Sequence, residues 1–334
     1  MSRPSSLLFV LTPQETREFL PAPLLEEMQA LAGHCTTLDP SGLSPAEFHQ
    51  ALAQANPEVL IGCWKTPALP TQLPPGLRYL CYLVGSVRRL VTPAHLADGL
   101  IVTNWGGSIS RTVAECALFH ILAGLRRAAH WTLAMHRDGA WKQSDNQAAS
   151  LFGRRVGLHG FGQIARELVR LLRPFGCAIS VFAPDVGPQT EREHGIRALA
   201  SLDALFAEND VVVELAPLIP ETIGCVTERH LRLLPPGSVF VNVGRGAVVD
   251  EAALLRVARE GNILVGLDVF GVEPLPRDSG FRGLPNVMLT PHLAGPTTDR
   301  RRDAGEFALA NLRAYAAGEP LRAVVDARTY ASIT

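Results

Sequence analysis

The chain of 334 residues is longer than one hydrophobic core usually serves, so two domains are expected. Hydrophobic residues make up 47% of the chain and charged residues 19%, and the formal net charge is -1. This composition is typical of a globular protein, and its charge balance does not favour a nucleic acid or a membrane surface as partner.

In the first third of the chain, short apolar segments alternate with amphipathic ones, a pattern that predicts a parallel α/β sheet. Strands are expected at Leu7–Leu11, Val59–Cys63, Leu80–Val84 and Ile101–Thr103. Helices are expected at Leu24–Leu31 and Ala46–Gln54, followed by a long helical run from about Ser110 to His136.

A second α/β series begins near Gly153. Its expected strands are Val156–His159, Ala178–Phe182, Val211–Leu215, Val239–Val243, Ile263–Leu267 and Val287–Leu289. Helices are expected at Gln163–Leu172, after the N-cap residue Asp250 as far as Gly261, and from about Thr298 to Ala317.

The cysteines and the N-terminus indicate the compartment. None of the six cysteines forms a CxxC pair, and no histidine cluster has metal-ligand spacing, so reduced thiols and no metal site are expected. The apolar run at residues 6–11 is too short for a signal peptide, and no run is long enough to span a bilayer. We therefore expect a cytoplasmic protein.

A glycine-rich turn stands between the strand ending at His159 and the next helix. Its sequence, G-x-G-x-x-A, comprises Gly160, Phe161, Gly162, Gln163, Ile164 and Ala165. In such a turn the first glycine permits the tight bend, the second lets a pyrophosphate approach the backbone, and the small third residue lets the helix pack on the strand. The helix N-terminus then attracts the phosphates. The motif predicts a dinucleotide site.

An acidic residue after the following strand would bind the ribose hydroxyls of the dinucleotide. Asp185 lies at acceptable spacing, whereas the neutral Ala183 stands where the acid is first expected. Arg192 and Arg197 follow and offer positive charge to a 2′-phosphate. We favour NAD, with NADP as the alternative.

Three later segments combine a strand end with unusual polar residues, and they span residues 241–251, 266–275 and 289–297. They contain Arg245, then Asp268 and Glu273, and then His292. Ligands of doubly wound sheets bind beyond the carboxyl ends of the strands, so these side chains are expected to converge.

With these segments the chain resembles the D-isomer-specific 2-hydroxyacid dehydrogenase family over nearly its whole length. The resemblance rests on the glycine turn followed in order by Asn-x-x-Arg-Gly, Asp-Val-Phe-x-x-Glu-Pro and Pro-His-x-x-Gly. It implies an oxidoreductase that transfers a hydride between NAD(P)H and C2 of a small 2-keto or 2-hydroxy acid, such as glyoxylate, hydroxypyruvate or glycerate, with D specificity.

The resemblance also implies roles for single residues. Arg245 is expected to bind the substrate carboxylate and polarise the keto oxygen. His292 is the expected general acid and base, with Glu273 as the carboxylate that orients it and favours its protonated form. Asp268 matches the residue that receives the nicotinamide carboxamide, and Pro217 matches a proline of the coenzyme-binding loop.

Gly85 lies where the family has a loop whose N–H groups hold the substrate carboxylate. The segment from Gly85 to Leu90 lacks the family's frequent Gly-x-x-x-x-Asp pattern, and Leu215 replaces a frequent histidine. Trp64 and Lys65 replace smaller polar residues and are candidates for the substrate side-chain pocket, although an exposed loop is an equally good interpretation.

The expected fold has two doubly wound parallel-sheet α/β domains. A flavodoxin-like substrate domain comprises residues 1–104 and 300–334, and a Rossmann coenzyme domain comprises residues 105–299. Trp131 and Trp141 lie where the family forms its dimer interface, so a homodimer is expected. An NAD(H)-sensing regulatory protein of the same fold and a phosphite-type dehydrogenase remain as alternatives.

Overall fold

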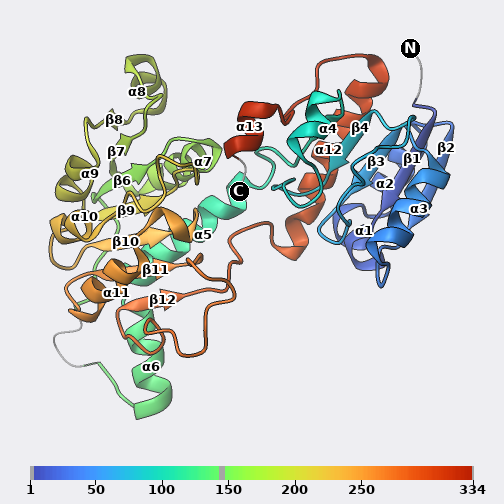
Figure 1. Ribbon diagram of the computed structural model, residues 1–334. Coiled ribbons are helices and arrows are strands. Elements are labelled where there is room, and N and C mark those ends of the chain that lie inside the picture. Colours follow the sequence, from blue (N-terminus) through green and yellow to red (C-terminus); the bar gives the residue numbers. More distant parts are fainter. Residues whose placement is uncertain (1–3, 143–146, 333–334) are drawn as a thin grey trace. The chain divides into compact units, whose positions relative to one another are not determined.

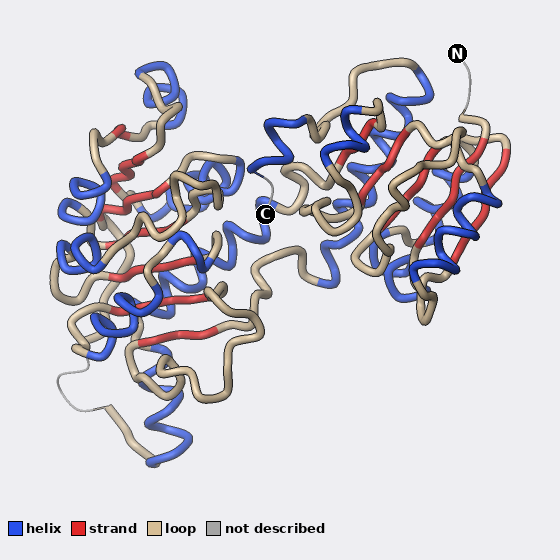
Figure 2. Tube along the Cα trace, viewed as in Figure 1, coloured by secondary structure: helices blue, strands red, loops and turns tan. Residues whose placement is uncertain are grey.

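The computed structural model describes residues 4–142 and 147–332, and the chain divides into two compact units. The first unit comprises residues 1–109 and 296–334, and the second comprises residues 110–295. The expected domain ranges include residues 1–3, 143–146, 333 and 334, which lie outside the described residues. Each unit contains one sheet and its own set of helices (Figure 1, Figure 2).

The sheet of the first unit has five parallel strands in the order β2-β1-β3-β4-β5. The strands are β1 (Ser6–Val10), β2 (His34–Leu38), β3 (Val59–Gly62), β4 (Tyr79–Tyr82) and β5 (Ile101–Thr103). This is the flavodoxin-like order, as predicted. The interior strands β3 and β4 are buried along their whole length, which explains why their sequences are continuously apolar.

The helices of the first unit are α1 (Pro13–Phe19), α2 (Ala22–Gln29), α3 (Pro45–Ala55), α4 (Pro93–Ala97), α12 (Arg301–Ala317) and α13 (Ala327–Ser332). Capping boxes at Thr12 and Ser44 start α1 and α3. Helix α12 packs on α1, α2 and β4. A Cβ at Gly305 would lie 1.9 Å from the carbonyl oxygen of Phe19, so only glycine permits this approach.

The second unit has seven parallel strands in the order β12-β11-β10-β9-β6-β7-β8. They are β6 (Arg155–His159), β7 (Ala178–Phe182), β8 (Arg197–Ala198), β9 (Val211–Glu214), β10 (Val239–Asn242), β11 (Leu264–Leu267) and β12 (Val287–Leu289). The strand order reverses between β6 and β9, as in the Rossmann fold, and this reversal is where dinucleotides bind.

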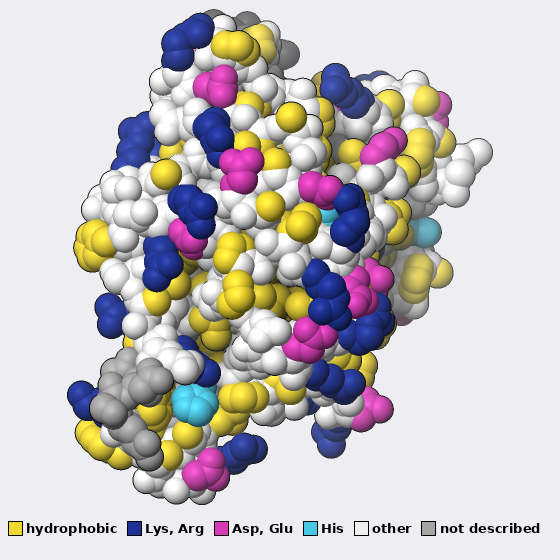
Figure 3. All heavy atoms as spheres, turned by 90° about the vertical axis from the view of Figure 1, so that its left-hand side faces the viewer, with side chains coloured by type: hydrophobic (Ala, Val, Ile, Leu, Met, Phe, Trp, Pro, Cys, Tyr) yellow, Lys and Arg dark blue, Asp and Glu magenta, His cyan; other side chains and the backbone are white. Residues whose placement is uncertain are grey.

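The helices of the second unit are α5 (Ser110–Leu125), α6 (Ala128–Asp138), α7 (Gln163–Leu172), α8 (Pro188–His194), α9 (Leu202–Glu208), α10 (Glu228–Leu233) and α11 (Glu251–Arg259). Helix α5 packs on α7, β10 and β11, while α10 packs on α9 and α11. Basic and acidic side chains are interspersed over the face shown in Figure 3. Ion pairs such as Arg256–Glu228 at 2.8 Å connect α11 with α10.

The prediction of one helical run from Ser110 to His136 is wrong. Helix α5 ends at Leu125, Arg127 adopts a left-handed conformation with φ 54°, and α6 continues to Asp138. Two contacts favour the break: the Arg127 N–H donates to the Gly124 carbonyl, and the Leu125 carbonyl accepts from Ala149. The left-handed residue is an arginine rather than a glycine, and Gly124 lies inside the last turn of α5, so the sequence does not mark the break at Arg127 itself.

The other predicted helices and strands are confirmed, with ends within about three residues of the observed ones. The elements that were not predicted are the edge strands β2 and β8 and the short helices α1, α4, α8, α9, α10 and α13. In the described part of the chain, no helix combines the length and apolarity needed to cross a bilayer.

Candidate active site

The glycine-rich turn joins β6 to α7 in the geometry that a dinucleotide requires. Gly160 has φ +91°, and a Cβ there would lie 2.9 Å from backbone atoms of Leu215 and Ala216, so glycine is needed on both grounds. A Cβ at Gly162 would meet nothing within 4 Å, which leaves the turn open to a ligand. Ala165 is fully buried, as expected of the small third residue.

Gly162 is the N-cap of α7, and Gln163 and Ile164 are the first two residues of this helix. Gln163 is exposed and Ile164 is half-buried. The first N–H groups of a helix have no partner within it, and the helix dipole adds positive potential there. The turn and the start of α7 therefore provide what a pyrophosphate needs, and these residues fit a dinucleotide coenzyme.

The remaining predicted coenzyme contacts lie in loops after neighbouring strands. Asp185 is exposed and lies in a turn three residues beyond the end of β7. Pro217 is exposed and follows β9, where its carbonyl accepts a hydrogen bond from the Thr222 hydroxyl at 2.5 Å. Arg197 forms an ion pair with Glu208, whereas Arg192 is an exposed residue of α8.

His292 and Glu273 come from two different loops and are hydrogen bonded. His292 Nδ1 lies 2.6 Å from Glu273 Oε2, and Glu273 Oε1 accepts from the Phe270 N–H at 3.0 Å. His292 has φ 51°, and its N–H donates to the Asp268 carbonyl. The His292 side chain is 48% exposed. With Nδ1 bound to Glu273, Nε2 is the ring atom that remains for a substrate.

Arg245 lies in the loop that follows β10, next to the loop that carries Glu273. A Cβ at Gly246 would overlap the carbonyl carbon of Phe270 at 2.0 Å, so glycine allows the two loops to touch. Asn242 shapes the turn, because its side chain bonds both Gly244 N and Arg245 O. Burial lowers the pKa of Arg245, and the carboxylate of Glu273 acts in the opposite direction.

Asp268 follows β11 and is fully buried. Its Oδ1 accepts from the Thr290 hydroxyl at 2.6 Å and from Leu293 N at 2.9 Å, and its Oδ2 accepts from Ala294 N at 2.9 Å. The carboxylate therefore anchors the loop that carries His292. Asp268, Glu273, His292 and Arg245 are thus brought together by loops that follow the adjacent strands β10, β11 and β12.

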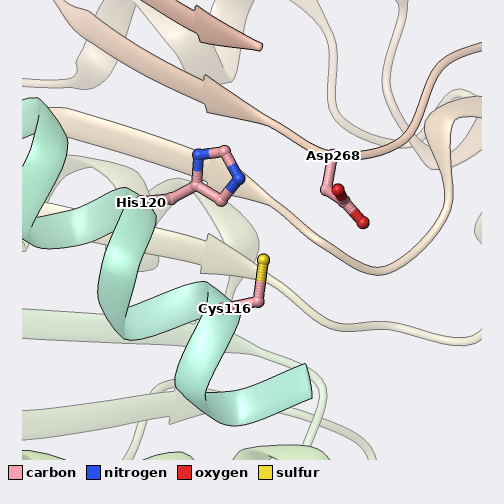
Figure 4. Close-up of side chains that lie close together, drawn as sticks. All are labelled: Cys116, His120 and Asp268. Atoms are coloured by element: carbon pink, nitrogen blue, oxygen red, sulfur yellow. The ribbon is translucent and has the colours of Figure 1, made fainter. Parts of the chain in front are cut away.

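Two residues of α5 that the sequence analysis did not single out approach the same carboxylate. Cys116 and His120 project from one side of α5 toward Asp268 (Figure 4). Donor atoms of the three side chains lie within 4.8 Å of one another. Burial, with the charges of Asp268 and Glu115 acting in the same direction, raises the pKa of Cys116 to about 12. A protonated thiol beside a carboxylate that already accepts three hydrogen bonds is a poor metal ligand.

His120 Nε2 lies 2.9 Å from Thr290 Oγ1. The single hydroxyl proton of Thr290 goes to Asp268, so His120 Nε2 is the donor in this contact. His120 Nδ1 is then an acceptor, and it has no hydrogen-bond partner among the described residues. Burial lowers the pKa of His120, while Asp268 opposes the shift. His120 is therefore a neutral donor at the start of a hydrogen-bond chain to the His292 loop.

The candidate substrate contacts of the first unit lie at strand ends of that unit. The Lys65 N–H donates to Glu15 Oε1 at 3.0 Å, and Trp64 is 44% exposed. The Trp64 ring packs edge-on against Phe19, and the Arg301 guanidinium lies 4.9 Å from its centre. These three neighbours were not predicted, although the Thr12-x-x-Glu15 capping box offered a signal for α1.

Gly85 follows β4 in the first unit. A Cβ on Gly85 would lie 2.8 Å from the Trp105 indole nitrogen, and the Gly85 carbonyl accepts from Asn104 Nδ2 at 2.9 Å. The close approach of Trp105 requires glycine at this position. The loop is thus fixed by residues 104 and 105, which the sequence analysis did not assign to it.

Comparisons with known proteins agree with this geometry. Residues 118–294 match the family model of the D-isomer specific 2-hydroxyacid dehydrogenase NAD binding domain. The chain is 34% identical over 229 residues to a glyoxylate reductase of Thermococcus litoralis, covering 66% of this chain and 68% of that protein. It is 35% identical over 225 residues to a hydroxyphenylpyruvate reductase of Plectranthus scutellarioides, covering 67% and 70%.

Among solved structures, D-mandelate dehydrogenase of Rhodotorula graminis superposes with a TM-score of 0.83 over 97% of this chain and 98% of that chain, at 21% identity. This likeness shows the fold. The family match and the two relatives show more: the chain belongs to the D-isomer-specific 2-hydroxyacid dehydrogenase family. Its second unit is an NAD-binding domain, and the protein is an oxidoreductase.

Proposed function

We propose that the chain reduces small 2-keto acids of the glyoxylate and hydroxypyruvate type to D-2-hydroxy acids and catalyses the reverse oxidation. The observation that carries this proposal is the 2.6 Å hydrogen bond between His292 and Glu273, beside the loop of Arg245. These three side chains supply an acid, its orienting carboxylate and a carboxylate-binding cation.

His292 acts as the general acid in reduction. Glu273 accepts a hydrogen bond from Nδ1–H, which fixes the ring and stabilises the imidazolium, so that Nε2 delivers a proton to the keto oxygen. In the oxidation the same nitrogen takes the proton back. Arg245 binds the carboxylate through its planar fork and polarises the keto oxygen before the reaction starts.

The coenzyme, when bound, supplies or accepts the hydride. Gly160, Gly162 and the start of α7 would hold its pyrophosphate, Asp185 its ribose and Asp268 its carboxamide. We propose NAD rather than NADP, because Asp185 is exposed beyond β7 and Arg197 is already paired with Glu208. In the first unit, we propose that the Gly85 loop binds the substrate carboxylate and that Trp64 and Lys65 contact its side chain.

The test is an absorbance assay of NADH and NADPH oxidation with glyoxylate, hydroxypyruvate, pyruvate and bulkier 2-keto acids. We expect turnover with the small acids, faster with NADH, and a D-hydroxy acid as product. Coenzyme binding without turnover of any of these acids would favour the regulatory sensor. Coenzyme reduction by phosphite together with inert 2-keto acids would favour the phosphite enzyme.

A further inference from the structure

A buried hydrogen bond between two ionisable side chains joins the two strands at which the sheet order of the second unit reverses. His159 ends β6, Glu214 ends β9, and the two residues are directly paired in the parallel register. His159 Nδ1 lies 2.5 Å from Glu214 Oε2, and the side chains are 7% and 0% exposed. The neighbouring strand positions are Leu158 and Val213, so two ionisable groups stand where the strands are otherwise apolar.

The pair lies where two loops of the coenzyme site begin, namely the glycine turn after β6 and the loop after β9. Gly160, which opens the pyrophosphate turn, follows His159 directly. Glu214 Oε1 accepts from the Ala216 N–H at 2.8 Å and so holds the loop that leads to Pro217. The two loops touch, because a Cβ on Gly160 would lie 2.9 Å from Ala216. The His159 ring also stacks on Phe182, at the end of β7, with ring centres 5.7 Å apart.

Stability alone does not account for this pair. Charges are costly to bury, and well-packed apolar residues in place of a buried ion pair are often neutral or stabilising. Apolar residues here would, however, leave the Ala216 N–H without its acceptor, and an unpaired buried amide is unfavourable. The specific effect of the pair is therefore to fix the loop after β9 against the glycine turn.

Other titratable groups face the pair from α10 and from the loop before it. Burial lowers the pKa of His230, with Arg229 acting in the same direction, and His230 Nε2 lies 3.1 Å from Asp203 of α9. Burial, with the charge of Glu214, raises the pKa of Cys225 to about 11. An experiment must therefore distinguish the effect of His230 from that of the pair.

We propose that His159 and Glu214 are positioning residues of the coenzyme site, and that the contact they make with the loop after β9 is required for full coenzyme affinity. They act through the Ala216 loop and the glycine turn rather than on the reacting atoms. The inference rests on the NAD-binding domain alone and does not depend on the roles proposed for Arg245, Glu273 and His292.

The test measures the dissociation constant of NADH by fluorescence titration, without substrate. Glu214→Gln keeps an acceptor for the Ala216 N–H, so it should bind NADH within about twofold of the unaltered protein. His159→Ile combined with Glu214→Leu removes that acceptor and should bind NADH about tenfold more weakly.

His230→Gln is the matched control, and it should bind NADH as the unaltered protein does. The proposal is overturned if Glu214→Gln binds NADH as weakly as the double variant. It is also overturned if the folded double variant binds NADH as tightly as the unaltered protein. Circular dichroism establishes folding, and if the double variant does not fold, Glu214→Ala takes its place.

Discussion

The loop that carries His292 is held by a chain of four hydrogen-bonding groups. His120 donates to Thr290, Thr290 donates to Asp268, and Asp268 accepts from the backbone of residues 293 and 294. His120, Thr290 and Asp268 are buried or half-buried, so the bonds between their side chains are protected from water. A Cβ on Gly266 would lie 2.8 Å from His120 Nδ1, so β11 provides the space that the imidazole occupies.

His120 should make the stability of the protein depend on pH. Burial lowers its pKa in the folded state, so the unfolded chain takes up a proton at His120 as the pH falls through about 6.5, while the folded chain resists it. The free energy of unfolding should therefore decrease below this pH, and the decrease should be smaller in His120→Gln. Urea unfolding at pH 8 and at pH 5.5 measures both. Equal decreases in the two proteins would refute this role.

The catalytic candidates and the residues that support them differ in how well the sequence predicts them. Arg245, Glu273 and His292 each follow a predicted strand in an ordered set of motifs, so their proximity could be expected. His120 lies three residues after the buried Ala117 on the apolar face of α5, which was a signal for burial. Its contact with Thr290, which follows β12, depends on the packing of α5 on β11 and β12, and no local pattern encodes that packing.

At the scale of elements, the prediction succeeds where burial is continuous. The interior strands β6, β9 and β10 are almost entirely buried and read as apolar runs. The edge strand β2, His34–Leu38, is mostly exposed or half-buried and contains two threonines, so it lacks that signal. Helices of five to eight residues such as α4 and α10 are too short for a clear helical period.

At the scale of the whole chain, the alternating pattern predicted two doubly wound sheets, and both strand orders agree with that prediction. The sequence also favours a homodimer, which we propose forms through α6. None of the 11 residues of α6 is buried, Met135 is 47% exposed and Trp141 beyond it is 72% exposed. An apolar face of this kind is typical of a surface that another chain covers.

Sedimentation equilibrium tests this assembly. We expect a mass twice the 36.0 kDa of one chain, and the mass of one chain after Met135→Glu combined with Trp141→Glu. Ile223→Glu is the matched control, because Ile223 is an equally exposed apolar residue outside α6, at 62%. A monomeric unaltered protein, or a double variant that stays dimeric, would contradict the proposed interface.

The proposed reaction depends on the contact between His292 and Glu273. The most direct measurement is therefore the kcat of His292→Gln with glyoxylate and NADH, together with its dissociation constant for NADH. We predict a kcat lower by about 10² to 10⁴, the usual contribution of a general acid, with NADH affinity changed by less than about twofold. A variant that turns over glyoxylate as fast as the unaltered protein would contradict the account.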